Sequence, residues 1–125
     1  MKSKKLVAVK YFRPGYIDYK EEMRILQFIN HSRCSRMIEK GTDGQLMKPS
    51  GKMIHDINYI VMDYVESEEL FGFLKKTFEG DGMGESFARF FMHQVLDSLE
   101  YIHSEKIVHR DVKLENLLID RNMNV

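Results

Sequence analysis

The stretch that decides the fold is His-Arg-Asp-Val-Lys-Leu-Glu-Asn, residues 109–116. Charged and amide side chains dominate it, and short apolar runs lie on either side, at residues 107–108 and 117–119. This pattern predicts a polar loop held between two strands. Five polar residue types at fixed positions match by chance in roughly one chain in 10⁴ or fewer, so simple solvation is a poor explanation of the motif.

The side chains of this loop suit phosphoryl transfer, which asks a protein mainly for positioning and charge neutralisation. Asp111 can accept or orient the proton of an attacking hydroxyl, and Lys113 can neutralise charge that builds on the transferred group. Asn116 offers a hard oxygen ligand to Mg²⁺. Their spacing places the three side chains on one tight loop.

Length and composition are those of a small globular protein. Hydrophobic residues make up 43% and charged residues 30% of the 125 positions, as in an ordinary folded domain. Nineteen basic and nineteen acidic side chains cancel, so charge gives no reason to expect nucleic acid or a membrane as partner. Cys34 is the only cysteine, which excludes an internal disulfide. No run approaches the roughly 20 apolar residues of a membrane span, so we expect a cytoplasmic protein, with a nuclear location not excluded.

The first third of the chain predicts strands around one helix. Residues 6–9 form an apolar, β-branched run that is typical of a strand buried on both faces. The pattern then becomes helical, which predicts a helix over about residues 19–30. Residues 36–56 contain several glycine turns and predict strands joined at Asp43-Gly44, or equally an irregular loop.

The rest of the chain predicts one further strand and then helices. Residues 57–65 are β-branched and aromatic, the strongest strand pattern of the sequence. A short helix is expected over residues 69–77, followed by a glycine-rich loop over 79–84. Apolar residues at helical spacing predict a long helix over residues 85–103. Its core-facing stripe comprises Phe87, Phe91, Val95, Leu99 and Ile102.

In this order, the motifs resemble the middle of a eukaryotic protein kinase domain of the serine/threonine type, over nearly all of residues 6–125. The resemblance implies an α+β, protein-kinase-like two-lobed fold that is incomplete. About 6–65 would be an antiparallel N-lobe sheet with one helix and the hinge, and about 66–125 the start of a helical C-lobe. The surroundings of residues 70–71 and 101–103 are similar to calcium/calmodulin-dependent and AMP-activated-like kinases.

The same resemblance implies ATP and Mg²⁺ as cofactors and names the residues that would bind them. Val-Ala-Val-Lys at residues 7–10 is similar to the third strand of these kinases, whose lysine, here Lys10, holds the ATP phosphates. Glu22 matches the helix glutamate that pairs with this lysine, and Glu21 is the alternative register. Asn116 would be the metal ligand. The remaining implied positions are Met62 behind the adenine, Ala8, Leu70 and Leu118 above and below it, the backbones of Asp63 and Val65 beside it, and Glu69 at the ribose.

Two parts of the kinase pattern do not occur in these 125 residues. No glycine precedes Lys10, and no Asp-Phe-Gly motif follows Asn116. We therefore expect a fragment of a kinase that transfers the ATP γ-phosphate to serine or threonine hydroxyls of proteins. The isolated chain is expected to have negligible activity and poor stability. The alternative is a non-catalytic, kinase-like binding or regulatory module.

Overall fold

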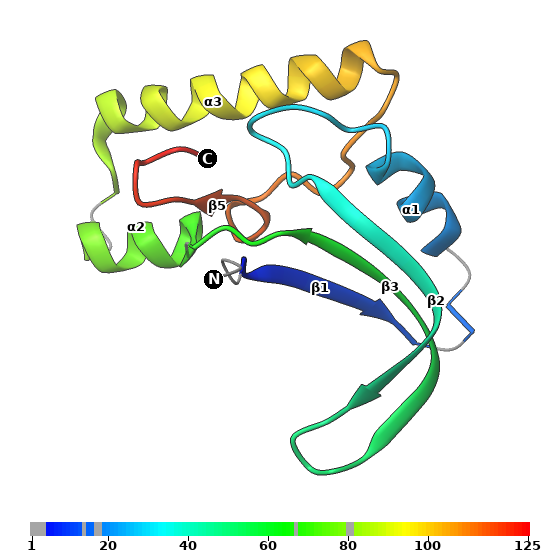
Figure 1. The fold of residues 1–125 in the computed structure, drawn as a ribbon. Coiled ribbons are helices and arrows are strands. Elements are labelled where there is room, and N and C mark those ends of the chain that lie inside the picture. The colour runs from blue at the N-terminus through cyan, green and yellow to red at the C-terminus, as the bar shows by residue number, and fades with distance from the viewer. Residues whose placement is uncertain (1–4, 14, 17–18, 67, 80–81) are drawn as a thin grey trace. The chain divides into compact units, whose positions relative to one another are not determined.

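The computed structural model divides into two compact units (Figure 1). The residues that it describes are 5–13, 15–16, 19–66, 68–79 and 82–125. Residues 1–30 and 35–64 make up the first unit, and residues 31–34 and 65–125 make up the second. The segment 31–34 therefore groups with the second unit although its chain neighbours on both sides group with the first.

The first unit is an antiparallel sheet with one helix. Its elements are β1 (Val7–Phe12), α1 (Tyr19–Leu26), β2 (Met37–Met47) and β3 (Met53–Asp63). β3 lies between β1 and β2 in the sheet. Phe12, Met23 and Ile60 form the buried cluster of this unit, and Ile60 is wholly buried. Because Met23 is on α1, this cluster joins the helix to the sheet.

The hairpin between β2 and β3 turns at a different place from the predicted one. The main chain reverses at Lys48–Lys52, where the Lys48 N–H donates to the Lys52 carbonyl at 2.9 Å. The predicted Asp43-Gly44 turn is wrong, because both residues lie within β2 at an irregularity of its register. A Cβ at Gly44 would come within 2.9 Å of the Tyr59 ring. Glycine is therefore needed here for the close approach of a ring, not for chain reversal.

The prediction that the first strand is buried on both faces is also wrong. β1 pairs only with β3 among the described residues, and Val9 is 57% exposed. The helix was predicted too long: α1 ends at Leu26, and the Phe28 N–H closes a tight turn on the Ile25 carbonyl. Phe28, which follows the end of the helix, is exposed.

The second unit contains two helices and a small ribbon. Its elements are β4 (Glu68–Glu69), α2 (Leu70–Phe78), α3 (Gly84–Ser104), the 3₁₀ turn η1 (Leu114–Asn116) and β5 (Leu118–Ile119). The structure confirms both predicted helices to within one residue at each end. β4 and β5 pair antiparallel, and Leu70, Phe91 and Ile119 form the buried core of the unit. Residues 107–108 form no strand, so the polar loop is followed by a strand but not preceded by one.

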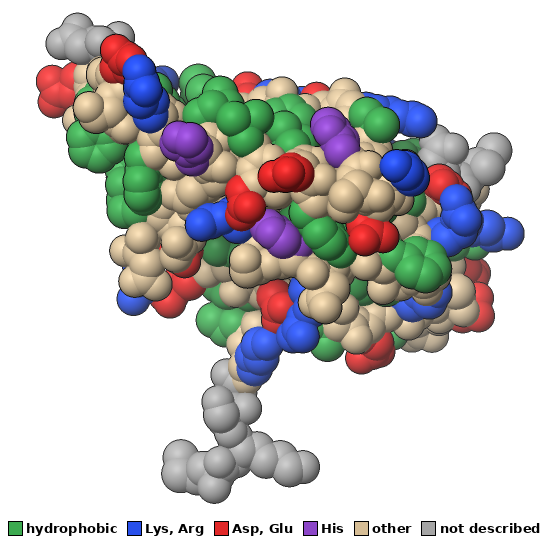
Figure 2. Space-filling model, turned by 90° about the horizontal axis from the view of Figure 1, so that it is seen from above, with side chains coloured by type: hydrophobic (Ala, Val, Ile, Leu, Met, Phe, Trp, Pro, Cys, Tyr) green, Lys and Arg blue, Asp and Glu red, His purple; other side chains and the backbone are tan. Residues whose placement is uncertain are grey.

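The long helix α3 buries only part of its predicted stripe. Phe91, Val95 and Ile102 are buried, whereas Phe87 is 47% exposed and packs edge-on against Phe78. Gln94, a residue outside that stripe, is buried beside them. Figure 2 shows hydrophobic side chains reaching the surface on the side seen from above, and three exposed apolar residues of α3 are Phe90, Met92 and Leu96. Within the described part of the chain, no helix is long and apolar enough to cross a membrane.

Candidate active site

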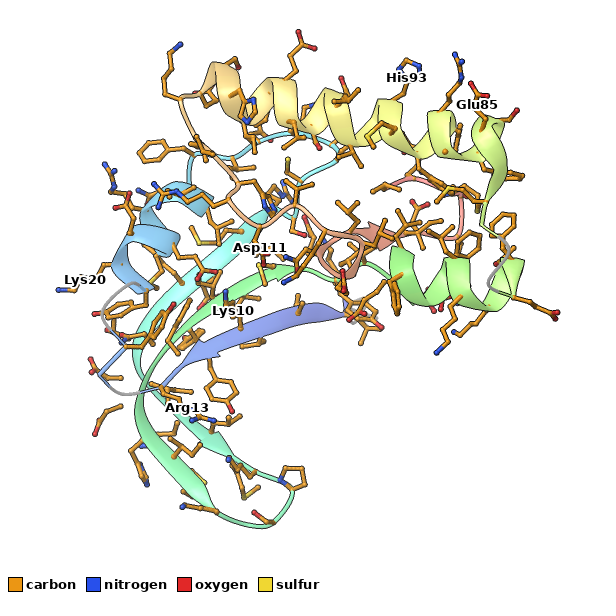
Figure 3. The ribbon with its side chains drawn as sticks, turned by 180° about the vertical axis from the view of Figure 1, so that it is seen from behind. Lys10, Arg13, Lys20, Glu85, His93 and Asp111 are labelled. Atoms are coloured by element: carbon orange, nitrogen blue, oxygen red, sulfur yellow. The ribbon has the colours of Figure 1, made fainter. Side chains whose placement is uncertain are left out.

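In the first unit, the structure brings Lys10 and Glu22 together as an ion pair between Lys10 Nζ and Glu22 Oε1. Lys10 lies opposite Ile60 in the β1–β3 register, and α1 packs onto Ile60 through Met23, the neighbour of Glu22. The two elements therefore meet where the pair forms (Figure 3). Lys10 Nζ also lies 5.3 Å from the ring centroid of Phe12, a cation–π arrangement.

The alternative register is not the one that the structure adopts. Glu21 pairs with Arg24 on the same helix, with Oε1 of the glutamate 3.0 Å from Nη2 of the arginine. Lys10 and Glu22 keep 49% and 32% of their side chains exposed. Glu22 thus orients the Lys10 ammonium. Because the ion pair is still open to solvent, this ammonium can also contact an anion.

In the second unit, three predicted catalytic side chains meet on the loop between α3 and β5. Lys113 Nζ lies 2.9 Å from Asp111 Oδ2. The Asn116 side-chain amide donates to the main-chain carbonyl and to the carboxylate of Asp111, both at 2.8 Å. The Asp111 side chain, labelled in Figure 3, is 62% exposed, so a substrate hydroxyl could reach it.

The charges of this cluster follow from its contacts. Hydrogen bonds from Lys113 and then Asn116 hold the pKa of Asp111 below its usual value. The bond to Asp111 raises the pKa of Lys113. At neutral pH both groups are therefore charged. A carboxylate with a lowered pKa is a weak base, and it is better suited to orient a hydroxyl by accepting a hydrogen bond than to remove its proton fully.

The local backbone explains how eight residues hold this arrangement. Arg110 has φ = 67°, in the left-handed region, and the next N–H, of Asp111, donates to Nδ1 of His109 at 3.3 Å. The 3₁₀ turn η1 then closes through a bond of 3.0 Å from the Asn116 N–H to the Lys113 carbonyl. A left-handed conformation costs a non-glycine residue about 1–2 kcal/mol, so the loop needs these bonds around it.

The predicted adenine-side residues of the first unit lie at the end of the sheet. Ala8 and Met62 are opposite each other in the β1–β3 register, and Met62 packs against the buried cluster. The Asp63 N–H donates to the Arg36 carbonyl at 3.0 Å. The predicted main-chain contact of Asp63 with adenine would therefore have to use the Asp63 carbonyl. Its carboxylate pairs with Lys5 and Arg36, and the bonds from these two groups lower the pKa of Asp63.

One of the predicted adenine-contacting residues of the second unit has to be corrected. Leu70 is 1% exposed and packs with Phe91 and Ile119, so it is a core residue and not the wall of an open site. Leu118 is 39% exposed and lies opposite Glu69, which is exposed at the start of α2. Val65 is half-buried, and its contact with adenine stays a prediction.

The donor chemistry of Asn116 fits Mg²⁺ as one ligand of several. Its Nδ2 is used by the two bonds to Asp111, so its amide oxygen is the atom that could face a cation. Mg²⁺ prefers such oxygen donors and usually keeps several waters. In the described ranges, no group of three or more His, Cys, Asp or Glu side chains could hold a metal ion. Asn116 therefore fits as a single Mg²⁺ ligand, and the described residues do not provide a complete metal site.

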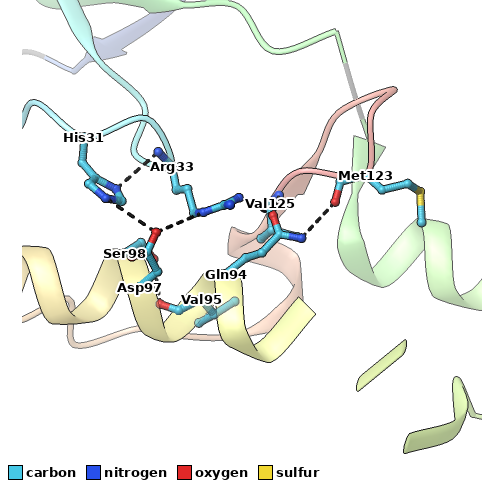
Figure 4. A network of polar contacts seen from close by, with 8 residues as sticks. All are labelled: His31, Arg33, Gln94, Val95, Asp97, Ser98, Met123 and Val125. Atoms are coloured by element: carbon cyan, nitrogen blue, oxygen red, sulfur yellow. Dashed lines mark hydrogen bonds and ion pairs between the residues drawn. The ribbon is translucent and has the colours of Figure 1, made fainter. Parts of the chain in front are cut away.

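The structure also reveals a polar network that the sequence did not predict (Figure 4). Buried Gln94 on α3 bonds to Arg33, to the carbonyl of Met123 and to the N–H of Val125. Arg33 Nε in turn lies 3.2 Å from Asp97 Oδ2. The sequence signal that could have pointed to this network is Gln94 itself, a neutral polar residue beside Val95 on the side of the helix where apolar residues recur.

A comparison with known families matches residues 1–125 to the model described as the protein kinase domain. This chain belongs to the protein kinase domain family. Its kinase domain is of the eukaryotic serine/threonine type, as the relatives indicate. Serine/threonine-protein kinase SIK2 of Gallus gallus is 38% identical over 104 residues, which are 83% of this chain and 11% of that protein. The SNF1-related kinase subunit KIN12 of Arabidopsis thaliana is 36% identical over 87% of this chain and 19% of its own length.

A solved structure agrees with this family. The crystal structure of Rad53 1-466 in complex with AMP-PNP matches with a TM-score of 0.73 and 30% identity. The match covers 92% of this kinase chain and 28% of that chain. The chain thus spans less than a third of each of these three proteins.

Proposed function

We propose that this chain is part of an ATP-dependent protein serine/threonine kinase, which transfers the γ-phosphate of ATP to a serine or threonine hydroxyl of a protein. The observation that carries the proposal is the cluster of Asp111, Lys113 and Asn116. On one short loop, the Lys113 ammonium and the Asn116 amide N–H both contact the Asp111 carboxylate. Positioning and charge neutralisation are what phosphoryl transfer requires.

The residues of the loop divide the work. Asp111 accepts a hydrogen bond from the attacking hydroxyl and aims its oxygen, and Lys113 faces the negative charge of the transferred group. Asn116 would hold Mg²⁺ through its amide oxygen while its amide nitrogen fixes Asp111. When bound, ATP would supply the phosphoryl group and leave as ADP, and Mg²⁺ would neutralise part of the negative charge.

The first unit would supply nucleotide-binding groups. Glu22 orients the Lys10 ammonium, which we propose binds the phosphates of ATP. Residues proposed around the adenine and ribose are Ala8, Met62, Asp63, Val65, Glu69 and Leu118. Leu70 is left out because it is buried in the core.

The test is phosphate transfer from γ-labelled ATP to serine- and threonine-containing peptides, with Mg²⁺. It should be run on the 125-residue chain and on the full product of the gene that encodes it. Asp111→Asn should lower transfer by the active form by about 10²–10⁴-fold and leave AMP-PNP binding in place. Lys10→Met should weaken AMP-PNP binding, whereas Lys40→Met, a matched change on β2 whose lysine bonds to Gln27, should not. Nucleotide binding without transfer by every form would favour the binding module.

A further inference from the structure

The segment that leaves the catalytic loop is held at its near end by backbone pairing and core packing. The Leu70 N–H donates to the Leu117 carbonyl at 2.7 Å, and Leu118 and Ile119 pair with β4. Ile119 is 3% exposed and packs with Phe91 of α3. Asn116 stands directly before this anchored stretch, so its position depends on where the stretch runs.

After β5 the chain makes a closed turn at residues 120–124. The Asp120 carboxylate accepts from the N–H groups of Asn122 and Asn124, both at 2.8 Å, and the Asp120 N–H donates to the Asn124 carbonyl at 2.9 Å. Met123 has φ = 64°, a conformation that is disfavoured without glycine. The Met123 N–H donates to the Asp120 carbonyl at 3.1 Å within the turn, so a contact from outside the turn can act on the Met123 carbonyl.

Gln94 supplies that contact from α3. Its Nε2 donates to the Met123 carbonyl at 3.1 Å, and its Oε1 accepts from the Val125 N–H at 2.9 Å. Gln94 is 6% exposed and lies one helical turn after Phe91. The same side of α3 thus holds both ends of the turn, through Phe91 at Ile119 and through Gln94 at Met123 and Val125.

Arg33 fixes which way the amide of Gln94 points. Arginine and a main-chain N–H can only donate, and both meet Oε1, whereas a carbonyl can only accept, and it meets Nε2. A flipped amide would break all three bonds. Asp97 holds the guanidinium from its other side, 3.2 Å from Nε. Arg33 comes from the segment 31–34, which groups with this unit (Figure 4).

We propose that Gln94, oriented by Arg33, is a positioning residue that holds the segment after the catalytic loop against α3 and thereby keeps Asn116 and Asp111 in register. The inference rests on the proposed function, which makes those two residues catalytic. Gln94 touches neither of them and acts through residues 117–125.

The test uses nuclear magnetic resonance on the labelled 125-residue chain and needs no enzymatic turnover. The readout is the pair of side-chain amide protons of Asn116, which donate to Asp111 and should resonate apart from those of a free asparagine. The second readout is hydrogen exchange of the Val125 N–H. Circular dichroism establishes that each variant is folded.

Gln94→Leu should make the Val125 N–H exchange at least ten-fold faster and move the Asn116 amide protons toward free-asparagine positions. Gln94→Glu keeps the acceptor for Arg33 and Val125 but loses the donor to Met123. It should retain Val125 protection and show an intermediate Asn116 signature, a partial rescue. His93→Leu, on the exposed side of the same helix (Figure 3), is the matched control and should change neither readout.

Unchanged Asn116 signals in folded Gln94→Leu would overturn the proposal. Equal changes in His93→Leu, or free-asparagine signals in the unmodified chain, would overturn it as well. If Gln94→Leu does not fold, Gln94→Glu decides the question. A changed resonance of the Met123 carbonyl together with unchanged resonances of the Asn116 side-chain amide would refute the positioning role of Gln94. None of these outcomes depends on kinase activity, so a failed transfer assay and a failed positioning role are distinguished.

Discussion

The two sets of candidate catalytic groups are built in opposite ways. Lys10 and Glu22 are 12 positions apart and meet only because a strand and a helix share the core around Ile60. Asp111 and Asn116 are five positions apart and are joined by local bonds within one loop. The arrangement of Lys10 and Glu22 should therefore be lost when the packing of the first unit is disturbed. The arrangement of Asp111 and Asn116 should depend instead on a few hydrogen bonds within the loop.

The largest effect is expected from a substitution that removes a catalytic group of the loop but leaves the fold intact. Asp111→Asn removes the carboxylate that orients the hydroxyl, and we expect transfer by the active form of the kinase to fall by about 10²–10⁴-fold. The side chain is 62% exposed, so the thermal unfolding midpoint should stay nearly unchanged. Rates of labelled phosphate transfer and circular dichroism melts measure the two parts. A variant that keeps its activity would contradict the role of Asp111.

The next effect breaks the packing under the ion pair. Ile60→Ala should lower the free energy of unfolding by about 2–5 kcal/mol, because Ile60 is wholly buried between β1, β2 and α1. Urea unfolding measures this change. Ile38→Ala on β2 is the control, since Ile38 is 45% exposed and should cost little. Equal costs for the two variants would show that this cluster does not hold the unit together.

A smaller effect sharpens the picture of the sheet that carries Lys10. Gly41→Ala would place a Cβ 2.5 Å from Cε1 of Tyr59, so the ring must move, at a cost of about 1–3 kcal/mol. Gly72→Ala on α2 is the opposite control. Its Cβ would meet the nearest atom at 3.4 Å, and the helix should gain up to about 1 kcal/mol. Chemical unfolding of both variants tests the signs, and destabilisation by Gly72→Ala would contradict the helical assignment.

The smallest effect concerns charge at the end of β3. Lys5 and then Arg36 lower the pKa of Asp63 from its usual 3.8. The stabilisation from these ion pairs is thus present above that value and is lost as the pH falls through the lower, folded pKa. Lys5→Met should raise the pKa of Asp63 without restoring it fully, since Arg36 remains. Carbon-13 titration of the Asp63 carboxyl measures the shift, and an unmoved pKa would exclude Lys5 as its cause.

Local patterns were the part of this kinase domain that could be predicted from sequence. The loop of residues 109–116 is recognisable because its groups contact each other over short separations. The helices α2 and α3 are recognisable because apolar spacing reports the packed face of a helix. Glu22 could be named only through the resemblance to kinases, since composition did not distinguish it from Glu21.

The errors share a physical cause, which is that the environment of a residue is set by distant parts of the chain. Asp43-Gly44 has the composition of a turn, but Tyr59 from β3 requires glycine there for space. Val9 has the composition of a buried strand, but β1 has a neighbour on one side only among the described residues. Leu70 was placed at a ligand by analogy, although Phe91 and Ile119 enclose it. Gln94 was missed because its partners at residues 33, 123 and 125 are all remote in sequence.

The grouping of residues 31–34 with the second unit has a practical consequence for dissecting this protein. A gene fragment that begins at residue 65 would encode every helix of the second unit but leave out His31 and Arg33. His31 stacks on Tyr101 with ring centroids 4.9 Å apart, and Arg33 holds the amide of Gln94. A separately expressed second half would therefore need this tetrapeptide restored, for instance by a linker that grafts residues 31–34 onto its start.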